Sequence, residues 1–171
     1  MEKNKLNDSL MAVMIEEEAW KELSMDFPWT EELLIKHRSK VDWDKISCNS
    51  SIKWTVSMLE RFRRNINWTE FSSSADDEVL IPEIVEKFEE EWDWKVLSNN
   101  SYLTFELVAK YADKWDWKQL ISYYRHDDLF SQDFLDMFID YIPADEFRDS
   151  GLWHALVERK EKELKKQIIM G

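Results

Sequence analysis

Glycine and proline are scarce in this chain of 171 residues, which has two glycines and three prolines. Hairpins and tight β-turns prefer these residues, so a fold built on β-hairpins is disfavoured, whereas abundant Glu, Lys, Leu and Asp favour helices. A single cysteine, Cys48, excludes an internal disulfide and a cysteine-based zinc cluster. We therefore expect an all-α protein.

Long apolar runs are also missing from the sequence. No stretch reaches the roughly eighteen apolar residues of a membrane span, and the first residues, MEKNKLNDSLMAVMIEEE, lack the order of regions typical of a signal peptide. The chain is 44% hydrophobic, so it is long enough and apolar enough to build a core. We expect a soluble, cytoplasmic protein without a membrane partner.

The negative charge is unevenly distributed along the chain. The formal net charge is -13, and residues 76–149 hold 20 acids and 7 bases, so this region carries the whole excess. Such a surface repels nucleic acid and attracts basic partners. We expect a basic protein surface as partner, such as that of a nucleic-acid-binding enzyme, and no direct contact with nucleic acid.

Tryptophans mark an internal repeat. The first five repeats place Trp in one column, at Trp20, Trp43, Trp68, Trp94 and Trp117. An apolar residue follows three positions later, and in four repeats a serine comes next: Ser24, Ser47, Ser72 and Ser98. A sixth repeat is degenerate, with Ala144 in the Trp column, as terminal repeats often are.

The segment before each Trp has helical periodicity. Apolar quartets at offsets 0, +1, +4 and +8, such as Met58, Leu59, Phe62 and Ile66, fall on one face of an α-helix. Hydroxyl residues stand at the expected N-caps: Thr30, Thr55, Thr104 and Ser131. Each repeat is therefore predicted to be a helix of about three turns, a short second helix and a loop.

The predicted fold is a short helical-repeat array, α-solenoid-like, of about six units of 23–27 residues. It occupies residues 9–148 of a single repeat domain spanning 1–171, after a disordered segment at 1–8 and before a C-terminal capping helix at 151–170. Units this short cannot bury their own apolar face, so the core must come from stacking neighbouring units.

The segment from Trp92 to Asn100 reads WDWKVLSNN and is followed by a threonine-led helix from Thr104 to Lys110. This pattern, WDWKxLSxN, resembles short tryptophan-containing helical repeats found in proteins of bacteria and large viruses. The resemblance covers roughly residues 10–148. It implies an α-solenoid-like fold and at most a binding role, and it brings no catalytic residues.

The aromatic and polar residues of the repeat have two interpretations. Trp92, Trp94, Trp115 and Trp117 could form an aromatic ladder that stacks bases or sugars, but we expect core anchors at the junctions between units. The polar residues before the column tryptophans, Asp42, Asn67, Asp93 and Asp116, are expected to cap the short helices. His37 occupies an aromatic core position, and His126 beside Asp127 and Asp128 is a weak metal candidate. We expect no metal, no cofactor and no enzymatic activity.

The acidic surface is the main functional candidate. Glu83, Glu86 and Glu90 share one face of the helix led by Pro82. The predicted partner-binding acidic face comprises Glu83, Glu86, Glu89, Glu90, Asp113, Asp127, Asp128, Asp133, Asp136 and Asp140. A rigid array of carboxylates can imitate the phosphates of duplex DNA.

Four interpretations follow from these observations. The leading one is a non-enzymatic protein-binding module, in sharper form an inhibitor that occupies a basic nucleic-acid channel, such as a phage-encoded antagonist (an anti-CRISPR, for example) of a defence nuclease. The alternative is a structural or adaptor repeat protein that binds through exposed loop aromatics, namely Trp29, Trp54, Tyr102, Tyr123 and Tyr124. Two other interpretations remain open. One is a solvated acidic face that only keeps the chain soluble, and the other is an enzyme whose catalytic carboxylates are brought together by the fold.

Overall fold

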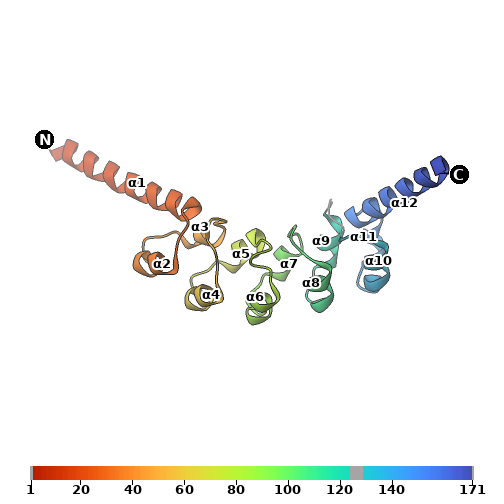
Figure 1. The fold of residues 1–171 in the computed structure, drawn as a ribbon. Helices are drawn as coiled ribbons and strands as arrows, with labels where there is room; N and C mark the ends of the chain where they lie inside the picture. Colours follow the sequence, from red (N-terminus) through yellow and green to blue (C-terminus); the bar gives the residue numbers. More distant parts are fainter. Residues whose placement is uncertain (1, 124–128, 171) are drawn as a thin grey trace. The chain divides into compact units, whose positions relative to one another are not determined.

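The protein is all-α, which confirms the fold class predicted from the sequence. In the computed structural model, which describes residues 2–123 and 129–170, every regular element is a helix (Figure 1). The helices are α1 (Glu2–Asp26), α2 (Glu31–His37), α3 (Trp43–Ser47), α4 (Val56–Phe62), α5 (Trp68–Ser74), α6 (Pro82–Lys87), α7 (Trp94–Leu97), α8 (Phe105–Lys110), α9 (Trp117–Ser122), α10 (Gln132–Phe138), α11 (Ala144–Phe147) and α12 (Gly151–Met170). None of these helices, over the described ranges, has the length and apolar character needed to cross a membrane.

Two compact units divide the chain, Met1–Glu91 and Trp92–Gly171. The first unit contains α1 to α6 and the second contains α7 to α12. The sequence repeat is present in both units, so each unit is built from repeats of one longer helix followed by one short helix. The single domain predicted over residues 1–171 stays a prediction.

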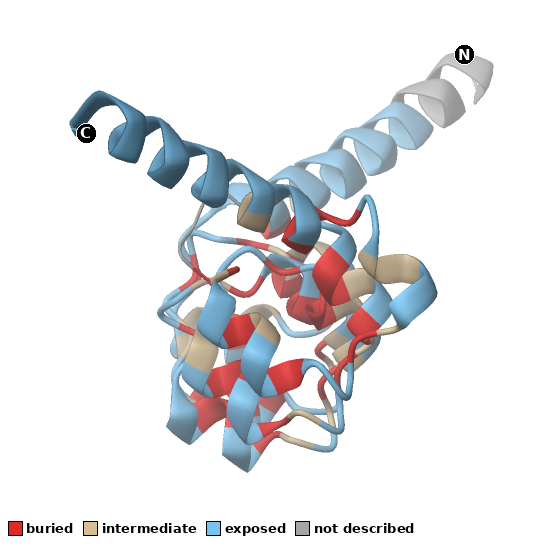
Figure 2. Ribbon diagram, turned by 90° about the vertical axis from the view of Figure 1, so that its right-hand side faces the viewer, coloured by how far each residue is buried: buried red, intermediate tan, exposed pale blue. Residues whose placement is uncertain are grey.

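The helices of each unit form two rows. In the first unit α2, α4 and α6 lie in one row, called the first row, and α3 and α5 lie in the other (Figure 1). Helix α3 packs against both α1 and α5. In the second unit α8 and α10 share one row, and α9 contacts α11 and α12. Figure 2 shows that buried residues concentrate where the two rows face each other, while most of α12 is exposed. This is a helical array in each unit, and its description as a solenoid stays a prediction.

The apolar quartets form the core, as their periodicity predicts. The second quartet position is fully buried at Leu34, Leu59, Val85 and Val108, each with 0% exposure. The third position is also buried at Phe62, Phe88, Tyr111 and Phe138, whereas His37 is half-buried.

Polar side chains begin the helices where the sequence predicts them. Hydroxyl oxygens cap the helices of the first row by accepting a hydrogen bond from a backbone N–H three residues later, at Thr30, Thr55, Thr104 and Ser131. Side-chain oxygens of Asp42, Asn67, Asp93 and Asp116 cap the short helices. Pro82 occupies the first turn of α6.

The first-row helices are shorter than the three turns expected. Helices α2, α4 and α10 have seven residues each, and α6 and α8 have six. After the third quartet position, which is aromatic in most repeats, the chain makes a turn tighter than that of an α-helix. In this turn the N–H of Asn65 donates a hydrogen bond to the carbonyl of Phe62 at 2.7 Å. This turn brings the chain to the cap of the next short helix.

Helix α1 is the exception to the repeat. It continues from Glu2 through Trp20 to Asp26, and Ala19 stands where the next four repeats have a capping Asp or Asn, so no side-chain cap starts a new helix there. Helix α1 includes residues 2–8, and the disorder expected for residues 1–8 stays a prediction. Lys and Leu in this stretch are good helix formers, and extending a helix is easier than nucleating one.

In three repeats a serine links the segment that begins at the column tryptophan to the next repeat. Within the first unit, Ser24 Oγ donates to the carbonyl of Trp20 at 2.6 Å and accepts from the N–H of Asp42 at 2.9 Å. In the second unit Ser98 Oγ donates to the carbonyl of Trp94 at 2.7 Å and accepts from the N–H of Asp116 at 2.9 Å. The recurring serine is thus a buried structural residue that connects neighbouring repeats.

Candidate partner-binding surface

The densest acidic stretch of the first unit is residues 76–91, the acidic α6 segment, which has eight acids and one base. Five of its apolar side chains are buried, namely Val79, Leu80, Ile84, Val85 and Phe88, whereas Ile81 is 38% exposed. The base, Lys87, forms an ion pair with Glu60 of α4 at 2.6 Å. Because the apolar residues take the inward positions, the carboxylates are left at the surface of α6 and its flanking turns.

The structure brings the four predicted acids of this segment together. Glu83 and Glu86 lie on α6 and are exposed. Helix α6 ends at Lys87, so Glu89, which is half-buried, and Glu90, which is exposed, lie in the following turn rather than on the helix. The prediction that Glu90 shares a helical face with Glu83 and Glu86 is wrong in this respect, because the chain turns tightly after Phe88.

The other described acids of the predicted face belong to the second unit. Asp133 and Asp136 lie on α10, Asp140 follows it, Asp113 follows α8, and all four are exposed. Asp136 accepts a hydrogen bond from the Gln132 amide at 2.7 Å. The predicted residues Asp127 and Asp128, together with His126 and Tyr124, lie outside the described residues. The predicted face therefore consists of one group of acids in each unit.

Asp113 has a structural partner in the next repeat. The hydroxyl of Tyr141 donates a hydrogen bond to Asp113, and the ring of Tyr141 stacks on Trp117 with centroids 5.3 Å apart. The nearby Asp113 carboxylate, and then its hydrogen bond, raise the pKa of Tyr141, with a smaller contribution from Asp140. Asp113 thus contributes to the junction between two repeats as well as to the acidic surface.

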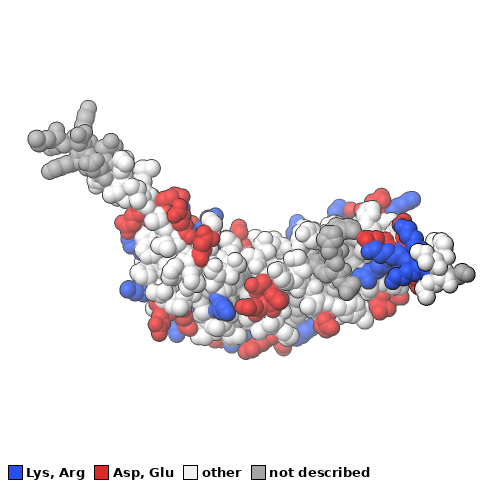
Figure 3. Space-filling model, turned by 45° about the horizontal axis from the view of Figure 1, so that its top comes forward, with Lys and Arg blue, Asp and Glu red and all other residues white. Residues whose placement is uncertain are grey.

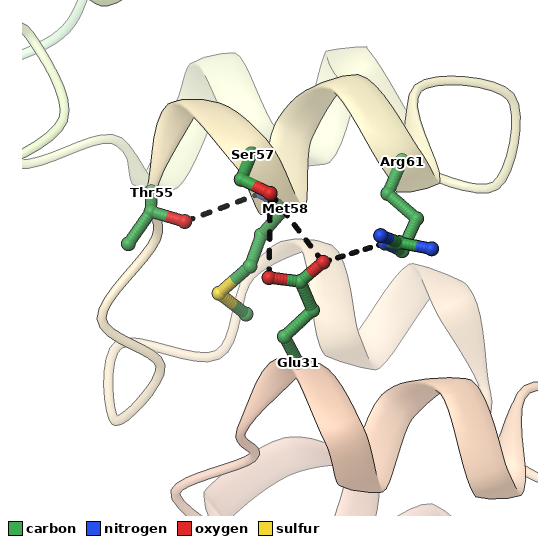
Figure 4. Close-up of polar contacts among 5 residues, drawn as sticks. All are labelled: Glu31, Thr55, Ser57, Met58 and Arg61. Atoms are coloured by element: carbon green, nitrogen blue, oxygen red, sulfur yellow. Dashed lines mark hydrogen bonds and ion pairs between the residues drawn. The ribbon is translucent and has the colours of Figure 1, made fainter.

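Ion pairs between neighbouring repeats were missed by sequence reasoning. Glu31 of α2 accepts a hydrogen bond from Arg61 of α4 at 2.5 Å, and the Ser57 hydroxyl lies 3.4 Å from both of its carboxylate oxygens (Figure 4). Thr55, drawn beside them, caps α4 by accepting from the N–H of Met58 at 3.2 Å. These contacts join α2 to α4, which are neighbours in the same row.

Further pairs span about one repeat. Arg63 contacts Glu91 at 2.5 Å, and Lys118 contacts Glu146. Glu16 of α1 pairs with Lys40 at 3.1 Å, and the hydrogen bond from Lys40 lowers the pKa of Glu16. The signal that reveals such pairs is opposite charge at a spacing of roughly one repeat.

Acidic and basic side chains are interspersed on the face shown in Figure 3. Acidic side chains stand in separate groups with bases between them, and bases gather on the C-terminal helix α12. The bases of α12 are Arg159, Lys160, Lys162, Lys165 and Lys166. Any acidic docking surface is therefore local to a segment, and the acidic α6 segment is the densest of these in the first unit.

The tryptophans are core anchors, as expected, and not a ligand-binding ladder. Trp92, Trp115 and Trp117 are 4%, 5% and 8% exposed, and Trp94 is half-buried. The ring of each column tryptophan packs on the aromatic residue of the following helix, in the pairs Trp20–His37, Trp43–Phe62, Trp68–Phe88, Trp94–Tyr111 and Trp117–Phe138. Stacking of a base or sugar would require open ring faces, which this packing covers.

The loop aromatics differ from one another in exposure. Trp29 is 6% exposed and its indole N–H donates to the carbonyl of Leu23 at 2.8 Å, so the expectation that it is an exposed loop residue is wrong. It is buried because its ring packs against Trp20, with centroids 6.3 Å apart. Trp54 is half-buried, whereas Tyr102 and Tyr123 are 49% and 48% exposed. Of the predicted loop aromatics that the structure describes, the two tyrosines are therefore the most exposed.

His37 lies in an aromatic cluster. Its ring is 5.2 Å from that of Trp20 and 6.1 Å from that of Trp29, as expected for a residue that replaces a core aromatic. Within the described ranges, no three His, Cys, Asp or Glu side chains are grouped so as to hold a metal ion. Cys48 is half-buried, and its thiol lies 3.5 Å from the carbonyl of Lys45.

Comparison with known proteins found no matching family model, no matching curated protein and no matching solved structure. The resemblance of the WDWKxLSxN pattern to tryptophan-containing helical repeats therefore stays a prediction.

Proposed function

We propose that the protein is a non-enzymatic binding module whose acidic α6 segment docks on a basic surface of a nucleic-acid-binding protein. The observation that carries this proposal is that, within residues 76–91, apolar side chains are buried while acidic side chains stay at the surface. Five apolar side chains are buried, the only base of the segment is paired with Glu60, and seven acids remain besides Glu91, which pairs with Arg63. The segment thus combines a fixed backbone with a high density of carboxylates.

Fixed carboxylates suit a groove that holds a polyanion. Duplex DNA carries one negative charge per about 1.7 Å of its axis, so a protein channel that binds it is lined with Lys and Arg. A rigid helix bearing Glu83 and Glu86, followed by the turn bearing Glu89 and Glu90, offers such a channel several carboxylates at once. Occupation of the channel would make the protein an inhibitor, and a phage-encoded antagonist of a defence nuclease is one setting for it.

A capture experiment from the native host at low and high salt tests this proposal. The triple variant E83K/E86K/E90K should lose the captured protein, because reversed charges are repelled by a basic surface. A matched variant, E17K/E18K/E22K, makes the same change in charge on exposed positions of α1 and should retain it. Captured protein that survives both the α6 substitutions and high salt would contradict the proposal.

The exposure of Tyr102 and Tyr123 favours a second candidate, an adaptor that binds through loop aromatics. Both lie at loops that follow short helices of the second unit, α7 and α9, and each is about half exposed. Binding through them would resist salt and would be lost in the variant Y102A/Y123A, because aromatic contacts depend on buried area rather than charge. The same capture experiment therefore separates the two candidates.

A further inference from the structure

A basic pocket lies in the first unit, although the chain as a whole is acidic. Its volume is about 520 Å³, and six charged side chains line it: Arg38, Glu60, Arg61, Arg63, Arg64 and Glu91. These residues lie in or just after the last turns of α2 and α4 and in the turn after α6. The pocket is thus formed by three successive helices of the first row, and its four arginines are exposed.

The bases of this pocket are all arginines. The chain has seven arginines and sixteen lysines, yet four arginines and no lysine line the pocket. The planar guanidinium group presents a fork of N–H donors that matches two oxygens of a phosphate or a carboxylate, whereas the lysine ammonium acts as a point charge. The composition of the pocket therefore suits an oxyanion better than a general excess of positive charge would.

The arginines are not part of the repeat pattern. The position after the third quartet residue is Arg38 or Arg63 in the repeats of α2 and α4, but it is Glu89, Ala112 or Ile139 in those of α6, α8 and α10. A base near the end of a helix interacts favourably with its dipole, but α6, α8 and α10 end without a base at this position. Ending the helices therefore does not require these arginines.

Three of the four guanidinium groups are held in place through one edge. The Nε of each donates to a side-chain oxygen of a neighbouring element, in the pairs Arg38–Asn65 at 3.0 Å, Arg61–Glu31 at 2.5 Å and Arg63–Glu91 at 2.6 Å. Figure 4 shows the second of these pairs. A guanidinium group has five N–H donors, so these bonds orient the groups and leave other donors for a ligand.

Two positive charges of the pocket are not compensated. Two of the four arginines have the carboxylate partners given above, and the remaining acid of the pocket, Glu60, pairs with Lys87 instead. Arg38, in contrast, bonds to a neutral amide, and Arg64 has no acidic partner in the part of the chain that the structure describes. A phosphate monoester carries close to two negative charges at neutral pH and has three acceptor oxygens, whereas a carboxylate or a phosphodiester carries one charge. The uncompensated charge therefore matches a phosphate monoester.

We propose that this pocket binds a single dianionic phosphate group carried by a phosphorylated side chain of a partner protein. All six lining residues are charged, so the pocket offers no surface on which a nucleotide base or an acyl chain would pack. An extended nucleic acid would bring further phosphates toward the acidic α6 segment, to which Glu91 of the pocket belongs, and would be repelled there. Recognition of a phosphorylated motif by clustered arginines is a known mode of peptide binding.

Nuclear magnetic resonance of the arginine Nε–H groups tests the proposal on the purified chain. The probes are inorganic phosphate and a capped, otherwise neutral peptide with one phosphoserine, each added at constant ionic strength. With both probes the resonances of the four pocket arginines should shift to saturation, whereas those of Arg148 and Arg159, outside the pocket, should not move. The unphosphorylated peptide and acetate should cause no saturable shift, because neither carries two negative charges.

Matched variants separate the pocket from general charge. R38Q/R64Q should weaken binding of the phosphoserine peptide at least about tenfold, since charge-assisted hydrogen bonds are lost. R38K/R64K should weaken it less, because the charge remains while the fork is lost. K21Q/K53Q makes the same change in net charge at exposed positions outside the pocket and should bind as the wild type does. Circular dichroism checks that each variant keeps its helices.

Several results would overturn the proposal. One is the absence of a saturable shift with the phosphoserine peptide, and a shift with inorganic phosphate alone would assign the pocket to a free anion. Equal binding of R38Q/R64Q and the wild type would place the peptide elsewhere. Tighter binding of short duplex DNA, lost in R38Q/R64Q, would assign the pocket to nucleic acid. No partner of the acidic α6 segment is present in these experiments, so their outcome is independent of the proposed function.

Discussion

The backbone N–H of Asn67 donates a hydrogen bond to the Oγ of Ser47, 20 residues earlier, at 2.9 Å. The same hydroxyl donates to the carbonyl of Trp43 at 2.6 Å, so one buried serine joins the end of α3 to the beginning of α5. Ser24 and Ser98 make the equivalent contacts with Asp42 and Asp116. The serine that follows the apolar position in the repeat therefore sets the register between successive short helices.

Substituting Ser47 with alanine should destabilise the first unit by about 1–3 kcal/mol, because the Asn67 N–H loses its acceptor in a buried place. Urea unfolding followed by circular dichroism measures the change. Ser50→Ala, at an exposed position three residues later, is the control and should alter the unfolding free energy by less than about 0.5 kcal/mol. Equal effects of the two substitutions would contradict the assigned role of Ser47.

The cap of α3 gives a second prediction. Asp42 accepts hydrogen bonds from the N–H groups of Asp44 and Lys45, so Asp42→Ala should cost about 0.5–2 kcal/mol of unfolding free energy. Asp42→Asn should leave the unfolding free energy nearly unchanged, because Asn67 performs the same role at α5. A loss of stability in the asparagine variant as large as in the alanine variant would show that charge, not capping, is what Asp42 supplies.

Local patterns predicted the fold well because they act over short distances. The caps at Thr30 and Thr55 and the buried positions of the quartets follow from hydrogen bonding and periodicity within a few residues. Helix α1 was partly missed, since its continuation depends on the absence of a cap at Ala19. The lengths of α2, α4, α6, α8 and α10 were overestimated, because the tight turn that follows each of them has no marked sequence signal.

Contacts between repeats were harder to predict. Asn49 is 3% exposed and its amide donates to the carbonyls of Ser24 and Phe27, each at 2.9 Å, yet its sequence context is that of a polar loop. Asn49 is buried because the preceding repeat packs against it, and the local sequence pattern does not predict that packing. The acidic α6 segment could be predicted from the density of acidic residues in the sequence. The ion pair between Lys87 and Glu60 could not be predicted, since it joins residues of different repeats.

The environment of Tyr141 gives a pH-dependent prediction. Its pKa is raised above the ordinary value of 10.0 because the Asp113 carboxylate disfavours the phenolate. Asp113→Asn should therefore lower the pKa of Tyr141, so that the phenolate forms at lower pH, and Asp140→Asn should do so to a smaller extent. Ultraviolet absorbance titration measures phenolate formation, and Tyr141→Phe assigns the signal among the five tyrosines. An unchanged titration curve in Asp113→Asn would contradict the assigned contact.

The pair between Glu31 and Arg61 should contribute modestly to stability. The two side chains are 29% and 54% exposed, and pairs of this kind are worth about 0.2–1 kcal/mol. A double-mutant cycle with Glu31→Gln and Arg61→Gln, followed by urea unfolding, measures the coupling, which should fall as salt is added. The exposed pair Glu18–Lys21, at 3.6 Å within α1, is the control and should show a smaller coupling.

Displacement of DNA from the captured partner tests the proposed function most directly. Fluorescence anisotropy of labelled duplex DNA, bound to that partner, should fall to the value of free DNA when the wild-type chain is added. E83K/E86K/E90K should leave the DNA bound, and E17K/E18K/E22K should release it as the wild type does. DNA that stays bound in the presence of the wild-type chain, or that E83K/E86K/E90K releases equally well, would contradict the proposal that the acidic α6 segment occupies a nucleic-acid channel.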